Sequence, residues 1–144
     1  MPQPIIYPFF KDSLGKLRPL IPIKIVNPHT SDSIITMALL DTGADACVFP
    51  KFIADRTKHN LKAEGVISNI QQGVGESKVE CWKHTYVIHL LSPDRKSEIW
   101  KSKAILIDCL DHDNAPPLLG WDGFMKNFTF SFQYSLNRIL IIPA

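Results

Sequence analysis

Short apolar segments separated by polar turns run through most of the chain, and their spacing is typical of strands rather than long helices. The segment Ile34–Leu40 is rich in β-branched and aliphatic residues and predicts a buried strand. The segment Arg18–Val26 alternates weakly, and the turn-forming residues 27–33 separate the two. This order predicts a β-hairpin. Further strands are expected over Val66–Ile70, Lys78–Leu91, Ile99–Cys109, Phe128–Gln133 and Ile139–Ile142.

Helices are expected to be few and short. Pro50 stands where a helix would begin, and the segment Lys51–Leu61 can follow as a short helix with its apolar residues on the inner side. His59, near the end of that helix, is expected on the surface. A second short helix is expected over residues 123–128. The pattern therefore predicts an all-β protein with one or two short helices.

The N-terminal residues 1–15 predict an extended arm. Pro2, Pro4 and Pro8 exclude a helix there and disfavour a central strand. The arm is either a frayed terminus or a docking element for a partner subunit. No internal repeat is visible in the rest of the chain, so residues 1–144 are expected to form a single domain.

Composition and charge exclude several classes of partner. A chain of 144 residues with 45% hydrophobic and 21% charged residues is typical of one soluble globular domain. A net charge of +2, with no run of basic residues, gives no reason to expect a nucleic-acid partner or a membrane surface. No apolar stretch approaches the length of a membrane span, and no signal peptide is visible.

The cysteines do not predict a disulfide framework. Cys47, Cys81 and Cys109 are odd in number and widely spaced, which favours buried free thiols and a reducing intracellular compartment. Cys109 lies close to His112 and to several aspartates, so a zinc site is conceivable. Only one thiol and one imidazole are near each other, and a polar surface turn is the favoured interpretation. No metal is expected.

The candidate chemistry lies directly after the strand Ile34–Leu40. Asp41 follows that strand, with Thr42, Gly43, Ala44 and Asp45 after it and a second apolar segment beyond. A carboxylate in such a place is costly to bury without a partner. The neighbouring hydroxyl can bond to it, and the glycine lets the backbone turn tightly. The sequence therefore predicts an acid held in a tight loop at the end of a sheet.

A strand, then Asp41-Thr42-Gly43-Ala44, then a second strand resembles the active site of the retropepsins, the single-lobe aspartic proteases that include the retroviral enzymes. The resemblance covers the chain from about Pro19 to its end. It implies a closed β-barrel lobe. It also implies a glycine-containing hairpin that covers substrate, which would correspond to Gly73, Val74 and Gly75. Ala44 and Asp45 would contact substrate together with that hairpin.

A third match to the family is Leu118-Leu119-Gly120, followed by a short helix. In retropepsins the apolar pair crosses behind the acid loop, and the glycine is needed because a side chain would strike that loop. Trp121 departs from the family, in which many members have an arginine that pairs with the acid at the position of Asp45. With tryptophan that ion pair cannot form.

The resemblance implies an aspartic endopeptidase that needs two carboxylates facing each other across a water molecule. The chain has one Asp-Thr-Gly, so it would act as a homodimer with one Asp41 from each subunit, supported by Thr42 and Gly43. The expected substrate is a peptide or polyprotein, and no cofactor is required. The alternative is a catalytically idle retropepsin-like module for dimerisation or peptide binding.

Overall fold

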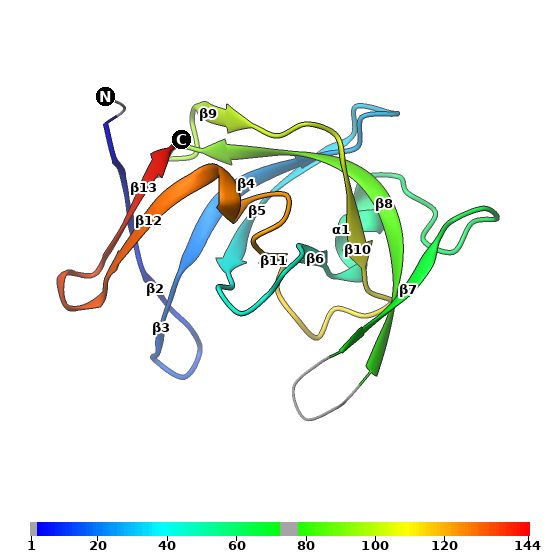
Figure 1. Cartoon of the computed structure of the whole chain (residues 1–144), viewed down its shortest axis with the longest axis horizontal. Coiled ribbons are helices and arrows are strands. Elements are labelled where there is room, and N and C mark those ends of the chain that lie inside the picture. The colour runs from blue at the N-terminus through cyan, green and yellow to red at the C-terminus, as the bar shows by residue number, and fades with distance from the viewer. Residues whose placement is uncertain (1–2, 73–77) are drawn as a thin grey trace.

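The computed structural model describes residues 3–72 and 78–144, and it consists mainly of strands (Figure 1). No helix among these residues is long and apolar enough to cross a membrane. The strands are β1 (Ile5–Pro8), β2 (Phe10–Lys11), β3 (Leu17–Arg18), β4 (Leu20–Val26), β5 (Ser33–Leu40), β6 (Val48–Phe49), β7 (Ser68–Gln72), β8 (Lys78–Leu91), β9 (Glu98–Lys101), β10 (Ile105–Cys109), β11 (Leu118–Leu119), β12 (Phe128–Gln133) and β13 (Arg138–Pro143). The helical elements are α1 (Lys51–Arg56) and the 3-10 turns η2 (Met125–Asn127) and η3 (Tyr134–Leu136).

The main sheet closes on itself. Its strands follow the order β10-β6-β11-β5-β4-β8, and β10 also pairs with β8, which completes a ring. The expected closed barrel is therefore present. Inward-facing side chains of the ring are fully buried, for example those of Ile23, Ile88, Ile107 and Leu119. Burying each such aliphatic side chain contributes about 1.5–3 kcal/mol, and this core fixes the positions of the loops at the ends of the strands.

The predicted hairpin is confirmed as β4 and β5, which pair in antiparallel register from Leu20 opposite Leu39 to Val26 opposite Ser33. The predicted strand Lys78–Leu91 is confirmed as β8 with the same bounds. This long strand pairs with β7 and β10 along its first half and with β4 and β9 along its second. β8 therefore pairs with four other strands of the main sheet.

The single strand predicted over Ile99–Cys109 is wrong, because the segment forms two strands, β9 and β10. Ser102 lies between them and is nearly buried. Its backbone N–H donates to the carbonyl of Ile88 at 2.9 Å, and its hydroxyl accepts from the N–H of Ile88 at 2.9 Å. The side chain thus replaces a backbone acceptor in the ladder, and the strand is interrupted at that point.

Helix α1 is shorter than predicted and ends at Arg56 instead of Leu61. The hydroxyl of Thr57 donates to the carbonyl of Ile53 at 2.6 Å, and Lys58 adopts a left-handed φ of 64°. Both features end the helix. His59, expected on the surface, is half-buried instead, and its ring contacts the rings of His84 and Tyr86.

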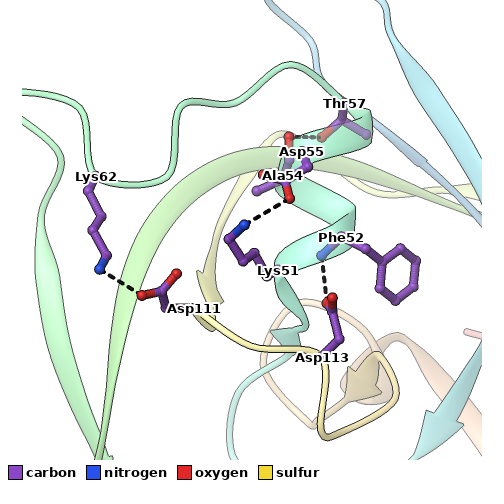
Figure 2. A network of polar contacts seen from close by, with 8 residues as sticks. All are labelled: Lys51, Phe52, Ala54, Asp55, Thr57, Lys62, Asp111 and Asp113. Atoms are coloured by element: carbon purple, nitrogen blue, oxygen red, sulfur yellow. Dashed lines mark hydrogen bonds and ion pairs between the residues drawn. The ribbon is translucent and has the colours of Figure 1, made fainter.

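Helix α1 is tied to the loop that leads into β11 (Figure 2). The carboxylate of Asp113 accepts from the backbone N–H of Phe52 at 2.8 Å, and the carbonyl of His112 accepts from the N–H of Lys51 at 3.0 Å. These bonds satisfy donors at the start of the helix that have no partner within it. They also hold the loop that positions Leu118 and Leu119.

The two ends of the chain form a separate sheet of order β1-β13-β12 (Figure 1). Ile5–Pro8 pairs with β13 in antiparallel register, so the predicted N-terminal arm is an edge strand of its own chain. Ile139 and Ile141 in β13 are fully buried and join the main core. The second predicted short helix is present only as the single turn η2.

Candidate active site

The acid loop, residues 41–46, begins where β5 ends. The backbone N–H of Asp41 donates to the carbonyl of Leu119 at 3.0 Å, so the first residue of the loop is fixed to the neighbouring strand β11. One carboxylate oxygen of Asp41 accepts from the N–H of Gly43 at 3.0 Å, and its carbonyl accepts from the N–H of Ala44 at 3.1 Å. Asp41 is half-buried, whereas Thr42 and Gly43 are exposed. The predicted tight loop is therefore present, with its acid partly accessible.

Strand β11 lies between the two strands that flank the loop. Leu118 and Leu119 pair in parallel with Leu39 and Leu40 of β5, and Leu118 pairs with Val48 of β6 on the other side. Leu119 is fully buried, so the strand cannot shift without opening the core. The two leucines therefore support the acid loop from behind, as the resemblance to the retropepsins implied.

Gly120 lies in close contact with the backbone of the acid loop. A Cβ atom built at this position would lie 2.5 Å from the carbonyl oxygen of Ala46 and 2.7 Å from that of Ala44. Real Cβ atoms essentially never approach a backbone oxygen so closely. The predicted need for glycine at position 120 is thus confirmed, and its cause is a steric contact with the loop.

Trp121 and Asp122 extend this support with three hydrogen bonds to the loop. The backbone N–H of Trp121 donates to the carbonyl of Ala44 at 3.1 Å, and that of Asp122 donates to the carbonyl of Asp45 at 2.7 Å. The indole Nε1–H of Trp121 donates to the carbonyl of Thr42 at 2.8 Å. The sequence identified tryptophan only as a missing arginine. A tryptophan directly after a glycine that contacts a loop could have suggested an indole N–H donor to that loop. The pattern of apolar positions gives no sign of such a bond.

The structure describes only some of the residues that were predicted to contact substrate. Ala44 is half-buried and Asp45 is exposed, and both belong to the acid loop. The predicted hairpin contacts Gly73, Val74 and Gly75 lie outside the described residues. Strands β7 and β8, which lead to that segment, pair from Ser68 opposite Trp82 to Gln72 opposite Lys78.

The side chains around Cys109 and His112 have structural roles. The Asp108 carboxylate pairs with Lys83 at 2.9 Å, and that of Asp111 pairs with Lys62 at 2.7 Å (Figure 2). Burial raises the pKa of the Cys109 thiol to about 12, which keeps it protonated. Within residues 3–72 and 78–144, no group of three or more histidine, cysteine or acidic side chains is arranged to hold a metal ion.

All three cysteines are buried and none of them forms a disulfide, as the sequence predicted. Cys47 follows the acid loop, and its thiol contacts the backbone carbonyl of Asp122 at 3.5 Å. Burial raises the pKa of the Cys47 thiol to about 11. This thiol is therefore a small apolar packing group beside the loop and has no nucleophilic character at neutral pH.

Comparison with known proteins gives information about the fold but not about the chemistry of the site. No family model matches the chain, and a search of curated proteins gave no match. Among solved structures, the chain is similar to EIAV protease complexed with the inhibitor HBY-793. The sequences are 23% identical, the match covers 78% of this chain and 89% of that one, and the TM-score is 0.50. The chain therefore has a retropepsin-like β-barrel fold.

Proposed function

We propose that this chain is one half of an aspartic endopeptidase, in which Asp41 and its counterpart from a second copy hydrolyse peptide bonds. The observation that carries the proposal is the support of the Asp41 loop. β11 holds the loop from behind through the bond from Asp41 N–H to the Leu119 carbonyl, and Gly120 allows close contact with its backbone. The likeness of the fold to EIAV protease agrees with this use of the loop.

The chemistry requires one ionised and one protonated carboxyl group. The ionised group takes a proton from the attacking water, and the protonated group polarises the scissile carbonyl. Because each chain contributes one half-buried Asp41, the pair is completed only when a second copy places its own loop opposite the first. Thr42, exposed beside the acid, would bond across the two-fold axis and orient the carboxyl groups.

Asparagine in place of Asp41 tests the proposal directly. The change is nearly isosteric, so we expect the fold and the dimer to persist while cleavage of a peptide library falls by about 10²–10⁴-fold or more. Asp122→Asn is the matched control, because the backbone of Asp122 bonds to the same loop while its side chain is 74% exposed. Cleavage that persists in a pure Asp41→Asn sample would refute the proposal that the chain is an aspartic protease. Peptide binding without cleavage by the wild-type chain would assign the idle module instead.

A further inference from the structure

Three histidine rings lie together where the end of α1, the turn between β4 and β5, and strand β8 meet. His59 follows the helix, His84 belongs to β8 and His29 belongs to the turn. The ring centroids of His59 and His84 lie 4.6 Å apart, and those of His59 and His29 lie 6.1 Å apart. His84 is buried, His59 is half-buried and His29 is exposed. The chemistry proposed for Asp41 uses none of these rings.

Two of these rings form reciprocal hydrogen bonds between β8 and the segment that follows α1. The Nε2 atom of His59 lies 2.9 Å from the carbonyl oxygen of Thr85 in β8. The Nε2 atom of His84 in β8 lies 2.9 Å from the carbonyl oxygen of Leu61. A carbonyl oxygen only accepts, so both Nε2 atoms carry a hydrogen and donate it, which leaves Nδ1 of each neutral ring without one. We call these two bonds the histidine clasp.

The histidine clasp holds residues 60–66 against the barrel. The backbone N–H groups of Ala63 and Val66 donate to carbonyls within this segment, at 3.2 and 3.1 Å, so these two bonds do not tie it to the barrel. The side chain of Leu61 is buried, and the carbonyl of the same residue accepts from His84. The clasp therefore fixes the one buried side chain of the segment in its place.

The charged groups beside His59 are already paired with one another. A cavity of about 310 Å³ next to this ring is lined by four charged residues, Lys51, Asp55, Lys62 and Asp111. Lys51 pairs with Asp55 at 3.2 Å, and Lys62 pairs with Asp111 at 2.7 Å (Figure 2). All four side chains are more than 40% exposed, so each ion pair contributes little to holding the segment. A proton on His59 would meet carboxylates that already have a cation.

The titratable groups on the other neighbouring strands do not supply a negative charge either. The ring of Tyr86 contacts His59, and burial raises the pKa of its hydroxyl, which therefore stays neutral. Burial also keeps the thiol of Cys109 in β10 protonated. Lys83 of β8 pairs with Asp108 of β10 at 2.9 Å. The imidazoles of His84 and His29 are thus the groups that respond to a charge on His59.

The folded cluster disfavours a positive charge on His59. Burial lowers the pKa of this ring below its ordinary value of 6.5, and the nearby rings of His84 and His29 lower it further. The bond to Thr85 acts in the opposite direction, because a charged ring donates a stronger hydrogen bond, but it does not outweigh burial. His59 therefore binds a proton more readily once it leaves the cluster for water.

We propose that the histidine clasp is a proton-sensitive contact that releases residues 60–66 from β8 in mild acid while the barrel stays folded. The ring of strands β10-β6-β11-β5-β4-β8 does not include this segment, so the segment can open without breaking that ladder. Opening places His59 in water, where its proton is not opposed by burial or by the neighbouring rings. The inference does not depend on the proposed function.

Amide hydrogen exchange followed by NMR measures the release without any assay of cleavage. The N–H groups of Ala63, Val66 and Lys83 report it, since that of Lys83 donates to the carbonyl of Ile67 at 2.9 Å where the segment ends. We expect their protection factors, corrected for the intrinsic pH dependence of exchange, to fall about fivefold or more between about pH 7 and about pH 5. The same fall should be seen in about 1 M urea, because a local opening exposes little surface.

Variants assign the effect to the clasp. Glutamine keeps an N–H donor but takes no charge, so the change with pH should shrink to less than about twofold in His59→Gln and in His84→Gln. His59 is only half-buried, so His59→Gln decides the matter if the buried His84 does not tolerate substitution. His89→Gln is the matched control, because His89 belongs to the same strand but pairs with Glu98, and it should keep the full change.

Three results would overturn the inference. The first is a set of protection factors for Ala63, Val66 and Lys83 that does not change between the two pH values. The second is a change with pH in His59→Gln as large as in the wild type, or one that is lost equally in His89→Gln. The third is a fall in protection that grows with urea as steeply as global unfolding does, since the segment would then open only with the whole barrel.

Discussion

Alanine in place of Gly120 should misplace the acid loop while leaving the barrel folded. The new Cβ would lie 2.5 Å from the carbonyl oxygen of Ala46, whereas ordinary contacts begin at 3.4 Å. The opposing atoms belong to the backbone of the loop, so no flexible side chain can move aside. Leu119 is fully buried, which holds β11 in place. The loop must therefore shift by about 1 Å.

The shift has a cost in stability and a larger one in activity. Overpacking of this kind destabilises a protein by about 1–3 kcal/mol, which for a chain of this size lowers the melting temperature by about 3–12 °C. A displacement of about 1 Å at a catalytic group reduces turnover by about 10²-fold. Calorimetry and peptide cleavage by the folded fraction at a common temperature measure the two effects separately.

Gly15→Ala is the control for Gly120→Ala. Gly15 has a φ of +79° and open space around its Cβ position, so alanine there strains the backbone without touching the acid loop. We expect Gly15→Ala to lose about 1 kcal/mol of stability but no activity per folded molecule. The reasoning is refuted if Gly120→Ala melts and cleaves like the wild type, or if both variants lose activity in proportion to stability.

Three further predictions concern solution conditions. The rate of cleavage should follow a bell-shaped pH profile with its maximum in acid, because the pair works with one shared proton; a rate that rises steadily above neutral pH would contradict it. Specific activity should fall on dilution as inactive monomer appears by sedimentation; constant activity in a monomeric sample would contradict that expectation. Burial lowers the pKa of His59 below its ordinary value of 6.5. The unfolded chain therefore binds a proton at this residue at a higher pH than the folded chain does. As a result, the free energy of unfolding decreases as the pH falls from about 6.5 towards the folded pKa. Urea unfolding at several pH values should show that the free energy of unfolding decreases less with falling pH in His59→Gln than in the wild type. Equal decreases would disprove the assignment of this pH dependence to His59.

Local patterns predicted the elements that carry the site. The alternation and the turn residues around β4 and β5 specify a hairpin whose register buries one face. The long segment that forms β8, rich in apolar residues, predicts one strand. The hairpin and β8 depend on residues close together in sequence, which the pattern of apolar positions expresses directly. The role of Gly120 was implied by the resemblance to the retropepsins, and the contact with Ala46 supplies its physical reason.

Features that depend on single side-chain hydrogen bonds or on the backbone conformation of a single residue were not predicted. The end of α1 depends on a bond from Thr57 to Ile53 and on a left-handed Lys58, and apolar spacing does not report either. The break between β9 and β10 depends on Ser102 reaching Ile88 across the sheet. The bond from Trp121 to Thr42 spans 79 residues. Hydrogen bonds of side chains such as Ser102 and Trp121 can be identified only once the fold brings donor and acceptor together.

The terminal strands show how the fold constrains assembly. Ile139 and Ile141 of β13 pack on the core of their own chain. β13 is the central strand of the sheet β1-β13-β12, so both of its edges are already paired. Exchanging it with a second copy would break the ladder to β1 or to β12. A second copy that pairs its acid loop with this one would therefore not need to exchange β13. Without strand exchange the two copies can separate while each keeps its fold, so dilution followed by sedimentation and an assay of cleavage measures their association directly.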